Sequence, residues 1–202
     1  MSRILVTAFE PYDNWHRNSS WLALVELTKD LPTYPPITTR LYPVDYQLLI
    51  DRLESDLTDE FSHVVHLGQA PGSSSLALEK LGVNVASRIG AQGIEYGPLV
   101  PNGPDAYQTQ VDLARLADLL RQAGIPCTLS HHAGTYLCNA ALYYSNHLIR
   151  QRQLNCHAMF VHLPLDVSQA AESKTPIPSL PSSVCAKGLR LLLDELTRSD
   201  RV

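Results

Sequence analysis

One cysteine of the chain lies where a reactive thiol could form. Cys138 follows the turn-like segment Ala133-Gly134-Thr135 and opens a stretch with helical periodicity. The first turn of a helix places a thiol at the positive end of the helix dipole, among N–H groups without partners, and both favour the ionised, nucleophilic form. The same N–H groups can stabilise an oxyanion that forms when a thiolate attacks a carbonyl. Taken alone, a cysteine at a helix start more often has a structural role, so its position does not decide its chemistry.

A histidine further along the chain could act as the base for such a thiol. His162 lies in the apolar segment from Ala158 to Leu163, which Pro164 ends. A strand of this composition has little reason to hold an imidazole, and the strand end is where a general base is expected. The alternative, a hydrogen-bonded histidine of the core, is the commoner outcome for this local pattern.

Glu79 could complete a triad of nucleophile, base and carboxylate. It interrupts the apolar segment from Leu76 to Val83. A carboxylate next to the imidazole would hold it in the required tautomer. Locally, the simpler interpretation is a solvent-facing glutamate paired with Lys80 or Arg88, so no single residue decides the matter.

Other polar groups carry weaker signals. The eight histidines, including the pair His131-His132, lack the spacing and carboxylate company of a zinc site. The loop at 68–75 could cradle a phosphate, but it has neither the ending of a P-loop nor a dinucleotide fingerprint. We therefore expect no metal and no cofactor.

Composition limits the classes of partner. With 45% hydrophobic and 18% charged residues among 202, the chain is typical of a globular protein with one well-buried core. A formal net charge of −4 without a Lys/Arg cluster argues against a nucleic-acid partner. No apolar stretch approaches the ~20 residues that span a bilayer, so we expect no membrane segment. We also expect no signal peptide, and the four cysteines show no paired spacing, which indicates reduced thiols in the cytoplasm.

Apolar segments of strand length alternate with helical periodicity along most of the chain. The pattern predicts strands at 3–9, 37–42, 63–67, 126–130 and 158–163, and an extended hairpin on the sheet edge at 76–85. It predicts helices from Asn18 or Ser19, from Asp45, and at 107–123, 138–150 and 184–198, with a long loop at 90–104. Helical core positions are expected at Leu22, Val25, Leu27, Leu48, Leu49, Leu53 and Leu57. Such alternation favours an α/β fold in one domain at 1–202, a three-layer α/β/α sandwich with a mostly parallel, partly mixed central sheet.

Ligands of open α/β sheets bind at the carboxyl ends of the strands. Most of the unusual residues lie at such places, after Phe9, after Leu67, before Cys138 and around His162. Their motifs resemble those of the cysteine-type pyroglutamyl peptidases (pyrrolidone-carboxylate peptidases), over nearly the whole chain. The shared motifs are ILVTAFEPY at 4–12, HLGQAPG at 66–72, LEKLGVN at 78–84, AGTYLCN at 133–139 and FVHLP at 160–164. Several motifs in the family's order are far more specific than any one of them.

The resemblance implies an activity and roles for individual residues. It implies a cysteine exopeptidase that hydrolyses the amide bond after an N-terminal L-pyroglutamyl residue through a thioester acyl-enzyme. Cys138 would be the nucleophile, His162 the base and Glu79 the carboxylate of the triad. The substrate-binding residues would be Phe9, Tyr12, Asn18, Gln69, Arg88, Ile89 and Leu137. The partners would be peptides with N-terminal pyroglutamate and further copies of the chain, in a homotetramer.

The sequence departs from the family pattern around the expected substrate pocket. Ala8 replaces a glycine, Tyr12 a phenylalanine, Asp13-Asn14 a pair of glycines and Ser73 an arginine. The triad positions are unaffected, whereas the shape of the pocket is expected to differ. Two alternatives stay open: a nucleoside phosphorylase-like enzyme of similar architecture that holds phosphate at 72–75, and a catalytically inactive homologue that serves for binding.

Overall fold

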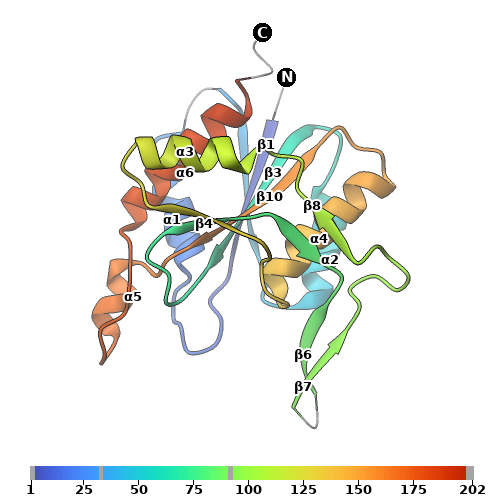
Figure 1. Cartoon of the computed structure of the whole chain (residues 1–202), viewed down its shortest axis with the longest axis horizontal. Coiled ribbons are helices and arrows are strands. Elements are labelled where there is room, and N and C mark those ends of the chain that lie inside the picture. Colours follow the sequence, from blue (N-terminus) through green and yellow to red (C-terminus); the bar gives the residue numbers. More distant parts are fainter. Residues whose placement is uncertain (1–2, 32–33, 91–92, 199–202) are drawn as a thin grey trace.

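A six-stranded sheet forms the centre of the structure (Figure 1). The computed structural model describes residues 3–31, 34–90 and 93–198, except for the side chains at 89 and 90. Across the sheet, the strands follow the order β2 (Ile37–Tyr42), β1 (Arg3–Phe9), β3 (Phe61–Gln69), β10 (His157–Leu163), β4 (Leu76–Glu79) and β9 (Cys127–Ser130). The first four strands are parallel, β4 runs antiparallel to β10, and β9 runs parallel to β4. The predicted mostly parallel, partly mixed sheet is confirmed.

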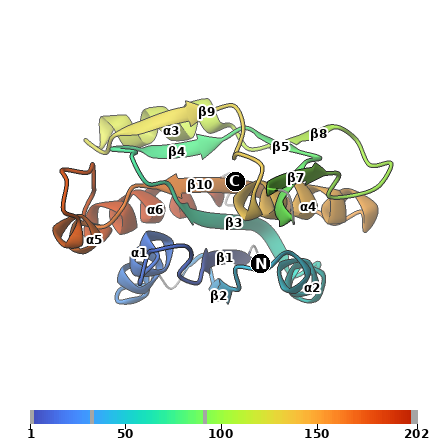
Figure 2. The ribbon, with the colours of Figure 1, turned by 90° about the horizontal axis from the view of Figure 1, so that it is seen from below.

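Helices cover both faces of this sheet (Figure 2). On one face, α1 (Ser19–Thr28), α3 (Leu113–Gln122) and α6 (Ser182–Leu196) share an apolar core with the strands. On the other face, α2 (Tyr46–Asp56) and α4 (Leu137–Gln151) share a second core. The predicted three-layer α/β/α sandwich is therefore confirmed. Within the described ranges, no helix combines the length and the apolar character needed to cross a membrane.

Alternation of side chains explains why the central strands have continuous apolar sequences. In β10, Val161 packs into the core on the side of α1 and α6, whereas Phe160 packs into the core on the side of α2 and α4. Both side chains are fully buried, because a strand covered on both faces has no solvent-facing positions. The same period of two places His162 on the face of Phe160, which is the face that α4 covers.

Polar caps decide where the helices begin. Asn18, one of the two predicted candidates, accepts a hydrogen bond from the Ser20 N–H at the start of α1. Asp45 accepts one from the Leu48 N–H at the start of α2, as predicted. The helix predicted at 107–123 begins only at Leu113, because Asp112 is its N-cap residue. The residues before it form β8 (Ala106–Gln108) instead.

The hairpin predicted at 76–85 is wrong. β4 is an interior strand between β10 and β9, and β5 (Leu81–Val83) leaves the sheet to pair with β8. The reason is a close approach of β5 to α4, where a Cβ on Gly82 would lie 2.6 Å from the backbone nitrogen of Tyr143. A glycine at this position lets the chain turn away under the helix.

The structure also differs from the sequence predictions in smaller respects. The segment predicted as a loop at 90–104 contains β7 (Gly93–Gly97), which pairs with β6 (Ala86–Gly90) in an antiparallel hairpin that projects from the body in Figure 1. A further helix, α5 (Val167–Glu172), was not predicted. Val25 and Leu48 are 39% and 53% exposed rather than in the core, because Ala23, Leu24 and Leu49 occupy the inward positions of their helices.

Candidate active site

Side chains from three elements meet at the carboxyl end of β10. Cys138 lies in the first turn of α4, His162 near the end of β10, and Glu79 at the end of β4. Glu79 is paired with Phe160 in the antiparallel ladder between β4 and β10. Directly paired residues leave a sheet on the same face, so Glu79 shares the face of Phe160 and His162. Since α4 covers this face, the fold brings all three predicted residues together.

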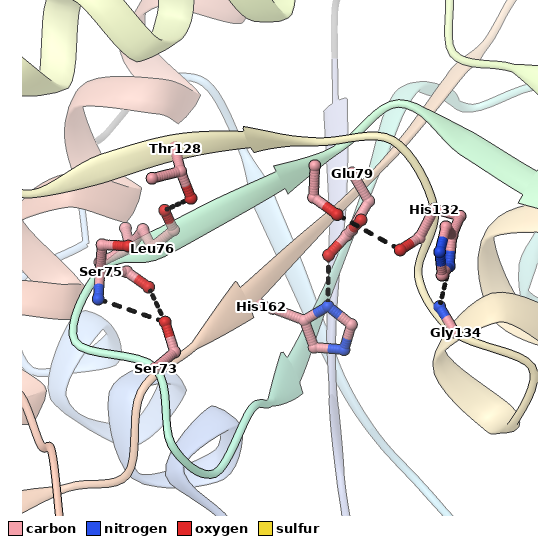
Figure 3. Close-up of polar contacts among 9 residues, drawn as sticks. Ser73, Ser75, Leu76, Glu79, Thr128, His132, Gly134 and His162 are labelled. Atoms are coloured by element: carbon pink, nitrogen blue, oxygen red, sulfur yellow. Dashed lines mark hydrogen bonds and ion pairs between the residues drawn. The ribbon is translucent and has the colours of Figure 1, made fainter.

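His162 lies between the carboxylate and the thiol. Its Nδ1 is 2.6 Å from Oε1 of Glu79 (Figure 3), and the imidazole also interacts with the Cys138 side chain. Because Nδ1 is occupied, Nε2 is the nitrogen left for the thiol. Oε2 of Glu79 is buried and has no hydrogen-bond partner among the described residues. A buried carboxylate with so few partners requires a nearby cation, and a protonated His162 provides it.

The charges on both neighbours favour the protonated form of His162. Burial alone lowers the pKa of its imidazole, but the negative charge of Cys138 and its interaction with the ring, together with the hydrogen bond to Glu79 and the charge of Glu79, outweigh burial and raise the pKa to about 10. The surroundings of His162 therefore favour its imidazolium form at neutral pH. The arrangement can hold a thiolate–imidazolium pair.

Cys138 differs from the other cysteines in its accessibility. All four are unpaired, but Cys127, Cys156 and Cys185 are buried whereas Cys138 is partly exposed. Burial raises the pKa of the Cys127 thiol to about 11 and those of the Cys156 and Cys185 thiols to about 12. These three thiols are therefore protonated at neutral pH and shielded from reagents.

The start of α4 is anchored by Asn139, which is fully buried. Its Oδ1 accepts a hydrogen bond from the Val83 N–H at 2.8 Å, and its Nδ2 donates to the carbonyls of Val83 and Val85 at 2.9 Å each. Tyr136, the N-cap residue, makes no side-chain cap hydrogen bond, so no capping side chain occupies the N–H groups of the first turn. The helix thus holds fixed N–H donors beside the thiol.

A glycine in β3 makes room for the thiol and for the ring beside it. A Cβ on Gly68 would lie 2.5 Å from Cζ of Phe160 and 2.9 Å from Sγ of Cys138. Both distances are shorter than any tolerated contact between such atoms. The sequence placed Gly68 at the end of a strand and in the loop at 68–75, and its role depends on a close approach between β3 and α4 that no local pattern encodes.

A largely apolar cavity of about 310 Å³ opens beside Cys138 and His162. The predicted residues in its wall are Phe9, Tyr12, Asn18, Gln69, Leu137, Cys138 and His162. Glu79 lies behind His162 rather than in the wall. Val44 and residues 133–136 complete the lining and were not predicted. Val44 lies just after the carboxyl end of β2. The rule that ligands bind at the carboxyl ends of strands would therefore have indicated Val44 if the rule had been applied to β2.

The carboxamides of Asn18 and Gln69 supply polar groups to this wall, and they differ in whether a hydrogen-bonding group is left without a partner. Asn18 is occupied by structure, because its Oδ1 accepts from the N–H and the hydroxyl of Ser20, and its Nδ2 donates to the carbonyl of Glu10 at 3.0 Å. Gln69 is 5% exposed, and its Nε2 is buried without a hydrogen-bond partner among the described residues. Its carboxamide also interacts with the Tyr12 hydroxyl, at a geometry short of a normal hydrogen bond. Gln69 therefore has an unused donor at the cavity.

Arg88 and Ile89 are not brought into the cavity wall. The guanidinium carbon of Arg88 lies 5.3 Å from the ring centre of Tyr46. The Tyr46 hydroxyl donates to the carbonyls of Ser87 and Thr135 at 2.8 and 3.2 Å, which ties the β6–β7 hairpin to the loop before Cys138. The side chain of Ile89 lies outside the described part of the chain.

Two departures from the family pattern have a clear structural outcome. Asp13 has a φ of 53°, a left-handed conformation that glycine adopts freely and aspartate tolerates better than most residues. The Ser73 hydroxyl donates to the Ser75 carbonyl at 2.7 Å and accepts from the Ser75 N–H (Figure 3). This hydroxyl is used within its own turn, which weakens the case for a phosphate at 72–75.

Comparison with known proteins agrees with the geometry. A family model described as pyroglutamyl peptidase matches residues 2–198. The pyrrolidone-carboxylate peptidase of Coprothermobacter proteolyticus is 35% identical over 201 residues, which cover 96% of each chain. That of Streptomyces coelicolor is 31% identical and covers 98% of this chain and 94% of its own. The crystal structure of pyrrolidone carboxyl peptidase from Fervidobacterium islandicum matches with a TM-score of 0.89 at 31% identity, covering 98% of this chain and 99% of that one. The chain therefore belongs to the pyroglutamyl peptidase family and is a cysteine peptidase.

Proposed function

We propose that the chain hydrolyses the amide bond after an N-terminal L-pyroglutamyl residue, with Cys138 as nucleophile. The observation that carries the proposal is the position of His162 in the wall of an apolar cavity, where it hydrogen-bonds to Glu79 and interacts with the Cys138 side chain. Pyroglutamate is a lactam without a charged α-amino group, so an apolar cavity with few polar groups suits it.

The reaction follows from the protonation states of the pair. The Cys138 thiolate attacks the carbonyl carbon of the pyroglutamyl residue, and N–H groups of the first turn of α4 stabilise the oxyanion. The C–N bond then breaks while imidazolium His162 gives its Nε2 proton to the departing amine, which leaves a thioester. Neutral His162 next accepts a proton from the water that attacks the thioester. The C–S bond breaks, pyroglutamate leaves, and the thiolate–imidazolium pair is restored.

Glu79 keeps His162 in the tautomer and orientation that these steps need. Its hydrogen bond to Nδ1 leaves Nε2 to exchange protons with the thiol, the amine and water. Its charge also offsets the cost of a buried imidazolium, which is why removal of the carboxylate should lower activity without removing the nucleophile.

The substrate ring is proposed to lie between Phe9, Tyr12 and Leu137, with Asn18 holding the segment after β1 in place through its hydrogen bond to the Glu10 carbonyl. The unused Nε2 donor of Gln69 would hydrogen-bond to the ring oxygen, the group that distinguishes pyroglutamate from proline. Arg88 and Ile89 stay predictions as substrate contacts.

The assembly and location follow only from the resemblance and the cysteines. We propose one peptidase domain at 1–202, a homotetramer and a cytoplasmic location. Unpaired cysteines at all four positions agree with a reducing compartment. Neither alternative gains support, because the Ser73 hydroxyl is engaged within its turn and the three triad side chains are in contact rather than dispersed.

The test is hydrolysis of a pyroglutamyl aminocoumarin reporter, run against the matching prolyl reporter. The wild type should cleave the first and not the second, and Cys138→Ser should abolish cleavage while the far-UV circular dichroism stays unchanged. The matched control is Cys127→Ser, at a buried thiol outside the cavity, which should keep activity. Iodoacetamide should modify Cys138 first, and full turnover by Cys138→Ser would refute the assignment.

A further inference from the structure

Gln169 makes a set of hydrogen bonds that reaches from α5 to the cavity wall. It is 3% exposed, and its Oε1 accepts from the Asp166 N–H at 2.9 Å in the capping box of α5. Its Nε2 donates to Oε1 of Gln69 at 2.8 Å and to the carbonyl of Arg17 at 3.0 Å. The capping box fixes which end of the Gln169 carboxamide is oxygen, so the end that faces Gln69 is the donor.

The orientation of Gln69 follows from these contacts. Its Oε1 accepts a second hydrogen bond, from the Ser19 N–H at 2.8 Å. If the carboxamide were flipped, its NH₂ group would face two N–H donors, and two hydrogen bonds would be exchanged for two repulsions. Its Nε2 therefore has to face away from Ser19 and Gln169, where this buried donor finds no hydrogen-bond partner in the part of the chain that the structure describes.

We infer that Gln169 is a positioning residue for substrate specificity, which holds the Gln69 carboxamide so that its Nε2 donates to the ring oxygen of the pyroglutamyl group. The inference rests on the proposed function. Prolyl peptides lack this oxygen and would leave the Gln69 donor buried and unpaired, and sites built around such a donor strongly reject the analogue without the acceptor. Gln169 acts through Gln69, since it is not among the residues that line the cavity.

The decisive variant is Gln169→Glu. A carboxylate of the same size still accepts from the Asp166 N–H, and glutamate is a favoured residue at this position of a capping box. It has no N–H to give to Gln69, and its charge attracts Nε2 of Gln69 in place of Oε1. The Gln69 oxygen would then face the substrate oxygen. We expect KM for the pyroglutamyl reporter to rise about tenfold, the effect of losing one buried hydrogen bond, while kcat changes less because the ring oxygen takes no part in bond breaking.

The matched control is Ser168→Ala in the same helix turn. It removes the hydrogen bond from the Ser168 hydroxyl to Asp166, 2.7 Å in length, without touching Gln69. This variant should lower the melting temperature slightly and leave KM unchanged. If Gln169→Glu melts below the assay temperature, Gln169→Met gives the same comparison with a smaller rise in KM, because the Ser19 N–H still holds the Gln69 oxygen.

A binding measurement separates this inference from the proposed function. 2-Pyrrolidone should protect Cys138 of the wild type against iodoacetamide, and about tenfold more of it should be needed for Gln169→Glu, while the alkylation rate without 2-pyrrolidone stays the same. A wild type that neither cleaves the reporter nor is protected contradicts the proposed function. The role of Gln169 alone is contradicted if the wild type is active and protected but KM of Gln169→Glu lies within twofold of the wild-type KM. The same holds if Ser168→Ala raises KM as much as Gln169→Glu does.

Discussion

The substitution Gly68→Ala tests whether the fold positions the thiol as closely as the structure indicates. The added methyl group would lie 2.5 Å from Cζ and 2.7 Å from Cε1 of Phe160, and 2.9 Å from Sγ of Cys138. Normal contacts between such atoms begin near 3.5 Å, so the ring or the strand has to move by about 1 Å, and the sulfur by somewhat less. The Phe160 ring cannot move out into solvent, because it is fully buried.

The expected effects on stability and on catalysis differ in size. Overpacking of this kind costs about 1–3 kcal/mol, which leaves a protein of ordinary stability almost entirely folded. A displacement of a reacting group by about 1 Å costs on the order of a hundredfold in rate, and the smaller displacement of the sulfur should still cost on the order of tenfold. The drop in kcat/KM should therefore far exceed the unfolded fraction.

The assay compares kcat/KM, melting temperature and the rate of Cys138 alkylation in the wild type and three variants. Gly97→Ala is the control, because a Cβ there meets nothing within 4 Å, and it should match the wild type. The double variant Gly68→Ala/Phe160→Leu removes the contact with the ring but not that with the sulfur, so it should regain stability and not activity. A Gly68→Ala protein with kcat/KM within twofold of the wild type would show that the thiol is not confined as argued.

Two further predictions concern pH. Glu79→Gln removes a charge that raises the pKa of His162, so the alkaline limb of the kcat/KM profile should move to lower pH. The maximum of kcat/KM should fall at least about tenfold. An alkaline limb at the same pH as in the wild type would contradict the pairing of Glu79 with His162. Burial lowers the pKa of His66 to about 3, and the ring bridges Thr7 and Ser145. The imidazole of His66 therefore takes up a proton more readily in the unfolded chain than in the folded one. The free energy of unfolding that is present above pH 6.5 should fall as the pH is lowered, by about 2 kcal/mol at pH 5. Urea unfolding at pH 7.5 and pH 5 should show this loss in the wild type and a smaller one in His66→Gln; equal losses would refute it.

The sequence predicted those parts of the fold that local patterns encode. The strand at 37–42 and the caps at Asn18 and Asp45 were predicted correctly because apolar runs and capping residues act over a few positions. The interior place of β4 was missed, because its neighbours β10 and β9 are distant in sequence and no pattern within the strand reports them. The same limit applies to Gly68. This position has no room for a Cβ because of Phe160, which lies on another strand.

The candidate site shows a similar division. The motifs around Cys138 and His162 indicated that these two side chains belong to one site, although the local pattern around each residue, taken alone, favoured a structural role. Gln169 could not be found in this way, because its helix is six residues long and its partner Gln69 lies 100 positions away. Residues that contact a ligand carry local signals at strand ends, whereas residues that orient them are recognised only by their hydrogen bonds.

The departures from the family pattern differ in how much they change the substrate pocket. Asp13 keeps the backbone conformation that a glycine would adopt, and the Ser73 hydroxyl is bound within its own turn. Tyr12 alone places a new polar group in the cavity wall, where burial and the negative charge of Cys138 raise the pKa of its phenol and keep it protonated. A neutral hydroxyl beside the Gln69 carboxamide can share the unused donor or add a second one to the ring oxygen. The chemistry that is particular to this chain therefore lies at Tyr12, next to the donor that Gln169 positions.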